Sequence, residues 1–241
     1  MKKETADKIL AATRQGYRKA AVETIQTHER LFREELERFV DYVRERESVL
    51  DVGCGDGRVF ETFKGKGVSY AGVDLSDDVI ARAKTRWAKE VAEGRVAFET
   101  GDLLDLPVED GRFDVVVAAG VLHHVPSAAY RAAAVSELAR AVHPGGYALI
   151  AVWNWWQPRH WGVLLHQMFG KKNGWDFGDL KVTWKKPVFP RYYHAFRMKE
   201  LRQLCEDAGF DVVEQQYVRR GDLVDWIRGE NLVTIARKRA S

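Results

Sequence analysis

The stretch Val49-Leu50-Asp51-Val52-Gly53-Cys54-Gly55-Asp56-Gly57-Arg58 decides the fold class. A short apolar strand runs into three glycines at alternate positions, and a helix is expected to follow. Glycines let the backbone turn tightly and let a ligand approach the main chain. The dinucleotide fingerprint Gly-x-Gly-x-x-Gly is not met, because its third glycine would fall at Arg58. A carboxylate at Asp51 would repel a pyrophosphate and suits a ligand with a cationic amino group.

Short apolar strands alternate with amphipathic helices on both sides of this stretch. The expected strands are Ser48–Val52, Ser69–Val73, Arg95–Thr100, Phe113–Ala118, Tyr147–Trp153, Phe210–Val218 and Asn231–Lys238. Helices are expected to begin near Asp56, Ser76 and Ser127, and another to span Met198–Ala208. This alternation predicts an α/β protein with a Rossmann-like, doubly wound, seven-stranded sheet.

Three regions follow from the same patterns. Residues 1–45 predict an N-terminal helical lid, since apolar residues recur there at three- and four-residue spacing. Residues 46–241 form the main domain. Within it, residues 154–196 interrupt the alternation with Gly, Pro and many aromatic residues, which predicts an inserted cap.

Polar residues stand where the second and third strands end. Asp74 closes the second strand, where a carboxylate can accept hydrogen bonds from two ribose hydroxyls. Asp102 follows the third strand and can accept a hydrogen bond from an adenine amine. Each has a structural alternative: Asp51 as a helix-facing structural acid, Asp74 as a helix cap, although Ser76 suits that purpose better, and Asp102 as a turn residue.

The order and spacing of these segments resemble the class I methyltransferases that use S-adenosylmethionine (SAM), especially the type 11 group. The resemblance covers about residues 45–153. It implies SAM as the cofactor, with Asp51 at its amino group, Asp74 at the ribose and Asp102 at the adenine. The expected cofactor-binding residues are Asp51, Gly53, Gly55, Gly57, Asp74, Leu75, Asp102, Leu103 and Ala119.

Composition excludes several classes of protein. Cys54 and Cys205 are the two cysteines, which excludes a disulfide scaffold and a cysteine-based zinc site and fits a reducing cytoplasm. No metal site is expected. No run of 18 apolar residues occurs, so neither a membrane span nor membrane association is expected. After the fourth strand, Ala119-Gly120-Val121-Leu122 replaces the Asn/Asp-Pro-Pro-Tyr/Phe of enzymes that methylate adenine or glutamine amino groups.

The cap segment 154–196 has an unusual composition. It holds seven Lys and Arg against two Asp, a net charge of +5, and 11 of the 27 aromatic residues. Basic residues interleaved with aromatic residues suit single-stranded RNA, because cations meet phosphates and rings stack on bases. The alternative is that the aromatic residues pack the cap onto the core while the lysines stay solvated.

A second resemblance concerns the cap. Val152-Trp153-Asn154, Val182-Thr183-Trp184-Lys185 and Arg191-Tyr192-Tyr193-His194-Ala195-Phe196 are similar to segments of the tRNA wobble-uridine carboxymethyl methyltransferases. The resemblance implies methyl esterification of a 5-carboxymethyl uridine in tRNA, with tRNA bound at the cap. It also raises a small activating protein as a partner, as in eukaryotic members.

Three residues are candidates for the chemistry. A carboxylate acceptor is already ionised, so it needs positioning, which Arg191 in a fork and Tyr192 through its hydroxyl can supply. A phenol, amine or carbon acceptor needs a base, for which His124 or its neighbour His123 is the candidate. These residues, like His194, can instead be structural. Two other functions stay open: a methyltransferase for a quinone, lipid precursor or natural product, and a non-catalytic SAM- or RNA-binding module.

Overall fold

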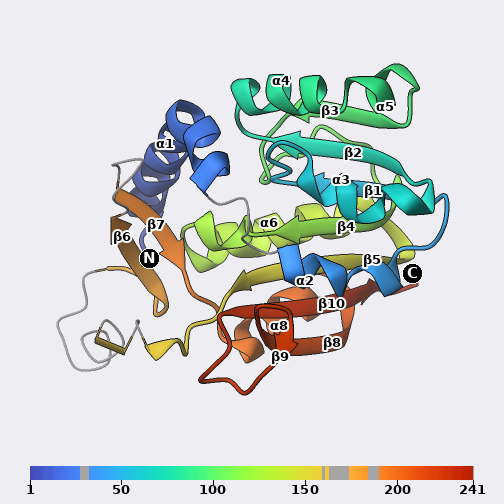
Figure 1. Cartoon of the computed structure of the whole chain (residues 1–241). Coiled ribbons are helices and arrows are strands. Elements are labelled where there is room, and N and C mark those ends of the chain that lie inside the picture. The colour runs from blue at the N-terminus through green and yellow to red at the C-terminus, as the bar shows by residue number, and fades with distance from the viewer. Residues whose placement is uncertain (28–32, 159–160, 163–173, 184–189, 241) are drawn as a thin grey trace.

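The chain folds around one large mixed sheet with helices on both faces (Figure 1). The computed structural model describes residues 1–27, 33–158, 161–162, 174–183 and 190–240, and the side chains of 1–19, 35–158, 161–162, 174–181 and 192–240. The strand order is β3-β2-β1-β4-β5-β10-β8-β9. The strands are β1 Ser48–Val52, β2 Ser69–Asp74, β3 Val96–Thr100, β4 Phe113–Ala119, β5 Val142–Trp153, β8 Phe210–Arg219, β9 Asp222–Leu223 and β10 Asn231–Lys238.

The first five strands run parallel, and β10, β8 and β9 add antiparallel pairs at one edge. This confirms the predicted α/β Rossmann-like fold, with one correction: the described sheet has eight strands rather than seven. The additional strand is β9, which turns back on β8 through Arg220 and Gly221, both with positive φ. A two-residue strand carries no periodic signal, so the apolar pattern did not predict it.

Helices cover both faces of the sheet because neighbouring strand residues point in opposite directions. In β1, Val49 belongs to the apolar layer that holds Phe60 of α3, while Leu50 belongs to the layer that holds Leu138 of α6. Burial on both faces explains why the parallel strands read as continuous apolar runs. The main helices are α3 Arg58–Phe63, α4 Asp77–Arg86, α5 Ala88–Ala92, α6 Ala128–Ala141 and α8 Met198–Asp207.

The N-terminal segment contains α1 Lys3–Thr27, α2 Arg33–Glu37 and the 3₁₀ turn η1 Val40–Tyr42. Helix α1, blue in Figure 1, lies at the end of the sheet where the parallel strands finish, beside β7. The described part of the cap contains a hairpin of β6 Asp179–Thr183 and β7 Pro190–His194. Among the described residues, no helix is both long and apolar enough to cross a membrane.

Candidate cofactor site

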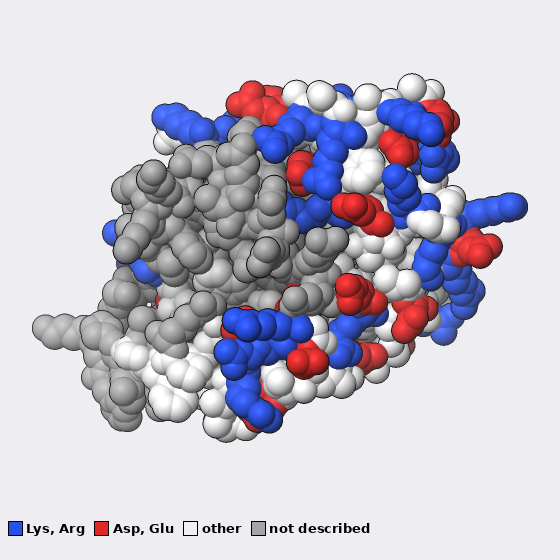
Figure 2. Space-filling model, in the orientation of Figure 1, with Lys and Arg blue, Asp and Glu red and all other residues white. Residues whose placement is uncertain are grey.

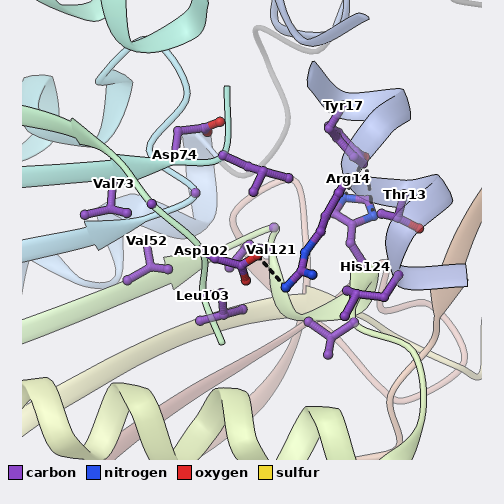
Figure 3. A pocket seen from close by; sticks show the side chains of 16 residues that line it. Thr13, Arg14, Tyr17, Val52, Val73, Asp74, Asp102, Leu103, Val121 and His124 are labelled. Carbon is purple, nitrogen blue, oxygen red and sulfur yellow. Dashed lines mark hydrogen bonds and ion pairs between the residues drawn. The ribbon is translucent and has the colours of Figure 1, made fainter. Parts of the chain in front are cut away.

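A pocket lies at the carboxyl ends of the parallel strands, beneath helix α1 (Figure 3). Parallel strands finish at the same edge of a sheet, which is how segments distant in sequence meet at one site. From the core it is lined by Val52, Gly53, Val73, Asp74, Leu75, Gly101, Asp102, Leu103, Gly120, Val121, His124 and Val125, and from α1 by Leu10, Thr13, Arg14 and Tyr17.

The glycine turn after β1 is tied to the end of β2. Gly53, Gly55 and Gly57 all have positive φ, at 74°, 56° and 78°. Gly53 donates its N–H to the carbonyl of Val73 at 2.8 Å, and a Cβ at Gly53 would lie 2.9 Å from Cβ of Val121. Gly53 lines the pocket, whereas a Cβ on Gly57 would meet the rings of Phe98 and Trp87. Gly55 and Gly57 therefore shape the turn rather than line the pocket.

Asp74 lies at the end of β2 with its carboxylate held by backbone groups. One oxygen accepts a hydrogen bond from Gly55 N at 3.0 Å, and the other accepts one from Ser76 N at 3.1 Å. Burial raises the pKa of Asp74 above its ordinary value, although the backbone hydrogen bonds oppose this. Ser76 stands at the N-cap of α4 but makes no side-chain cap hydrogen bond, contrary to the expectation that it is the better cap.

Asp51 and Ala119 do not line this pocket, although both were expected to bind the cofactor. The Asp51 carboxylate is buried and accepts a hydrogen bond from the hydroxyl of Tyr70. Burial raises the pKa of Asp51 to about 7, and the Tyr70 hydrogen bond opposes that rise. In place of Ala119, the pocket is lined by the next two residues, Gly120 and Val121.

Asp102 joins the loop after β3 to the lid. Its Oδ1 accepts a hydrogen bond from Leu104 N at 2.9 Å, and its Oδ2 lies 2.6 Å from Nη2 of Arg14. The neighbouring Leu103 is nearly buried and lines the same part of the pocket. Asp102 is therefore a turn residue and a pocket residue together.

The four lid residues were missed at the sequence level. Leu10, Thr13, Arg14 and Tyr17 are spaced at i, i+3, i+4 and i+7, so they share one face of α1. That spacing is the sequence feature that could have indicated them. It was not sufficient, because nothing in the sequence of α1 indicates which part of the protein this face covers.

Two consecutive histidines in η3 Leu122–His124 have different environments. His124 lines the pocket, and its Nε2 lies 2.8 Å from the hydroxyl oxygen of Tyr17. His123 is buried, stacks on Trp153 and Tyr193, and has a pKa well below its ordinary value because burial disfavours the charged ring. The ring of Tyr193 is 4.7 Å from that of His124, so strand β7 of the cap lies against η3.

Tyr192 points into a buried charged cluster instead of this pocket. Its hydroxyl donates to Asp179 and accepts from Nη1 of Arg131 at 3.3 Å. His194 lies between Asp179 and Glu200, at 2.8 Å from each. Arg131 also pairs with Asp176 at 3.0 Å, and only 2% of its side chain is exposed. Burial and the charge of Asp179 raise the pKa of Tyr192, so its phenol stays protonated.

The remaining predicted residue, Arg191, is described only in its backbone, which pairs with Val182 in the β6–β7 hairpin. Its side chain lies outside the described residues, as do most of the basic residues counted in the cap, namely Arg159, Lys171, Lys172, Lys185 and Lys186. In the described part of the chain no group of three or more His, Cys, Asp or Glu is placed to hold a metal ion.

Comparison with known proteins identifies the family. The family described as "Methyltransferase domain" matches residues 24–215. The tRNA (carboxymethyluridine(34)-5-O)-methyltransferase of Schizosaccharomyces pombe is 27% identical over 194 residues, which cover 70% of this chain and 76% of that protein.

Two solved structures share the fold. One is the 1,6-didemethyltoxoflavin-N1-methyltransferase of Burkholderia thailandensis with bound 1,6-didemethyltoxoflavin and S-adenosylhomocysteine. Its TM-score is 0.67 at 23% identity, and the match covers 95% of this chain and 88% of that chain. The other is a chain from the complex that contains the Haloferax volcanii Trm112 methyltransferase activator, with a TM-score of 0.68 at 20% identity, covering 95% and 98%. This chain belongs to the methyltransferase domain family, and it is an enzyme that uses SAM as its methyl donor.

Proposed function

We propose that this methyltransferase esterifies the carboxylate of a 5-carboxymethyl group on a wobble uridine of tRNA. The observation that carries the proposal is the position of strand β7, which holds Arg191-Tyr192-Tyr193-His194 and packs against η3 through Tyr193 and His124. The motif that resembles the tRNA enzymes therefore lies beside the pocket. The Schizosaccharomyces pombe relative, whose name states this reaction, supports the proposal because the match covers most of both chains.

The pocket residues suit SAM. Asp74 and Asp102 place two carboxylates in the lining of the pocket, and the buried Nε of Arg14 has no hydrogen-bond partner among the described residues. We place the ribose at Asp74 with Leu75, the adenine at Asp102 with Leu103, and the methionine portion at the turn of Gly53. When bound, SAM supplies a methyl group on a cationic sulfur that is already activated toward a nucleophile.

The protein's part in such a transfer is alignment and exclusion of water. A carboxylate acceptor is ionised at neutral pH, so no side chain has to remove a proton from it. Arg191 is the proposed positioner, because a guanidinium can bind a carboxylate through two parallel hydrogen bonds. Tyr192 is not carried forward as its helper, because its hydroxyl is engaged with Asp179 and Arg131.

A small-molecule acceptor is the second candidate, and three observations favour it. His124 and Tyr17 face each other in the pocket, where a base would be needed for a phenol or an amine. Several described aromatic residues of the cap, including Trp155 and Phe196, are buried in the core instead of open to bases. On the face in Figure 2, the described Lys and Arg lie interspersed with Asp and Glu.

A direct assay separates the two candidates. Purified enzyme is incubated with methyl-labelled SAM and either an anticodon stem-loop carrying 5-carboxymethyluridine or a matched stem-loop with plain uridine. Label transferred only to the carboxymethylated stem-loop, and released by mild alkali as expected of a methyl ester, supports the proposal. The assay is repeated with a small activating protein of the Trm112 type added, since such a partner is proposed as well. An inert stem-loop under both conditions contradicts the tRNA assignment.

A further inference from the structure

Arg14 reaches from the lid across the pocket to the loop after β3 (Figure 3). Its Nη2 lies 2.6 Å from Oδ2 of Asp102, which fixes one side of the guanidinium. Its Nε is buried, and within the described chain it has no hydrogen-bond partner. A buried donor left without an acceptor is destabilising, so such an atom on a residue that lines a pocket points to a ligand that accepts from it.

Asp102, the partner of Arg14, can accept a further hydrogen bond. Oδ1 of Asp102 accepts from Leu104 N and Oδ2 faces Arg14, yet each carboxylate oxygen has two lone pairs. Asp102 can therefore accept one more hydrogen bond without losing Arg14. The pair presents an acceptor on Asp102 and a free donor at Nε of Arg14, and the contact of 2.6 Å between Nη2 and Oδ2 keeps the two side chains together.

Adenine has the reverse pattern along its edge. Its exocyclic amine donates, and a neighbouring ring nitrogen accepts. We propose that Arg14 is an adenine-recognition residue: Asp102 accepts from the amine, and Nε of Arg14 donates to the adjoining ring nitrogen. Helix α1 then contributes to base specificity as well as covering the site. The inference rests on the proposed placement of the cofactor in this pocket, and it needs no assumption about the methyl acceptor.

The test uses S-adenosylhomocysteine, the reaction product, and calorimetry instead of activity. Arg14→Ala is expected to bind it roughly tenfold or more weakly than the wild type, as for one hydrogen bond to a charged donor. The matched control is Lys8→Ala on the same helix, whose exposed side chain pairs with Glu4, and its affinity is expected to stay unchanged. Thermal unfolding of the ligand-free variants verifies that each is folded.

Two further probes address the ring nitrogen itself. The 1-deaza and 7-deaza analogues of S-adenosylhomocysteine each replace one ring nitrogen by C–H. One of them is expected to bind the wild type roughly tenfold more weakly than the parent compound, yet to bind Arg14→Ala as well as the parent does. The inference is overturned if Arg14→Ala keeps wild-type affinity, or if neither deaza penalty shrinks in this variant.

Asp74→Ala separates this inference from the placement on which it rests. If Asp74→Ala and Arg14→Ala both bind S-adenosylhomocysteine as tightly as the wild type, the cofactor does not occupy this pocket and both proposals fall. If only Asp74→Ala weakens binding, the placement stands and the role of Arg14 is refuted.

Discussion

The hydroxyl oxygen of Tyr17 lies 2.8 Å from Nε2 of His124, and their rings are 4.7 Å apart. The two residues are 107 positions apart in the chain, one on the lid and one on the turn after β4. The ring of His124 also lies 4.7 Å from that of Tyr193 on cap strand β7. Arg14 makes a second polar contact, with Asp102, so two polar contacts join α1 to the lining of the pocket.

The first prediction concerns Tyr17→Phe, which keeps the ring and removes the hydroxyl. We place the acceptor beside Tyr17, which lines the pocket against His124, and therefore expect kcat/KM for the acceptor to fall about tenfold. The affinity for S-adenosylhomocysteine should stay within about twofold, since the adenosine contacts are elsewhere. Tyr130→Phe is the matched control, because its hydroxyl also ties core to lid, at Asp7, without lining the pocket. Equal losses in both variants would mean that Tyr17 only anchors the helix.

The second prediction separates a carboxylate acceptor from an acceptor that must lose a proton. For a carboxylate, Arg191→Lys should lower kcat by up to about 10²-fold, because an ammonium cannot reproduce a two-pronged grip on the acceptor. His124→Ala should then have a much smaller effect. The rate should be flat from about pH 6 to 8, without a limb near the imidazole reference pKa of about 6.5.

The measurement is steady-state kinetics with the carboxymethylated stem-loop across that pH range. The ranking reverses if the acceptor is a phenol, an amine or a carbon acid. In that case His124→Ala loses about 10²–10⁴-fold, as expected when a general base is removed, and activity falls on the acid side. That outcome would leave the methyltransferase assignment intact and remove the ester-forming one.

The third prediction uses the elevated pKa of Asp51, which burial raises to about 7. In the unfolded chain an aspartate has a pKa of about 3.9, so between about pH 4 and 7 the folded state holds a proton that the unfolded state has lost. The contribution of protonated Asp51 to the free energy of unfolding is thus complete below about pH 4 and is lost as the pH rises toward 7. Asp51→Asn should flatten this decline in the free energy of unfolding and make the ligand-free protein more stable above pH 7.

Urea unfolding at several pH values checks this, and cofactor affinity supplies the second readout. A purely structural Asp51 predicts that Asp51→Asn binds S-adenosylhomocysteine like the wild type. A loss of about tenfold or more would instead support the sequence-based prediction that Asp51 supports the amino group of the cofactor.

The fourth prediction concerns the buried cluster that joins cap to core. Arg131→Met removes the cation between Asp176, Asp179 and Glu200 and should lower the free energy of unfolding by about 3–5 kcal/mol, since buried carboxylates lose their partner. The control is Arg239→Met, whose exposed pair with Asp211 should contribute less than about 1 kcal/mol. Equilibrium urea unfolding compares them.

The same cluster makes the stability of the fold depend on pH in the acid range. Burial alone would raise the pKa of Glu200, but the hydrogen bond from His194 and the charge of Arg131 hold it below its ordinary value. A carboxyl group with a lowered folded pKa stabilises the protein above its unfolded pKa, about 4.3 for glutamate, and that contribution disappears as pH falls through the folded value. The wild type should therefore lose stability below about pH 4 more steeply than Arg131→Met. The prediction is refuted if the free energy of unfolding of the two proteins falls with the same slope as the pH is lowered.

Local sequence patterns predicted the core and the residues at the strand ends, because both are determined by residues that are close together in the sequence. The glycine turn and the closing residue of β2 follow from strand periodicity and short spacing. Gly53, Asp74 and Asp102 accordingly line the pocket. Asp51 does not line it, because side chains alternate along β1 and Val52 is the residue that faces the pocket. Ala119 does not line it either, because β4 ends at Ala119, one residue later than expected, and the pocket is lined by Gly120 and Val121.

The contacts across the lid and the cap could not be predicted in this way. Arg14 and Asp102 meet only because α1 folds back over the sheet, and no feature of either segment specifies the other. Arg131 lies on an ordinary-looking helix, where an arginine is usually read as solvent-exposed, yet three carboxylates from the cap and α8 surround it. Long-range packing determined both sets of contacts.

The carboxylate of Asp74 also has a consequence for engineering the donor site. It accepts the N–H of Gly55 while facing the pocket, so a single side chain shapes the glycine turn and the proposed ribose contact. A substitution made to admit a donor analogue with an altered sugar would also change the loop proposed for the amino-acid portion. Mutational effects at these two places should be epistatic, and variants accepting such analogues should be sought by randomising positions 53–57 and 74 together.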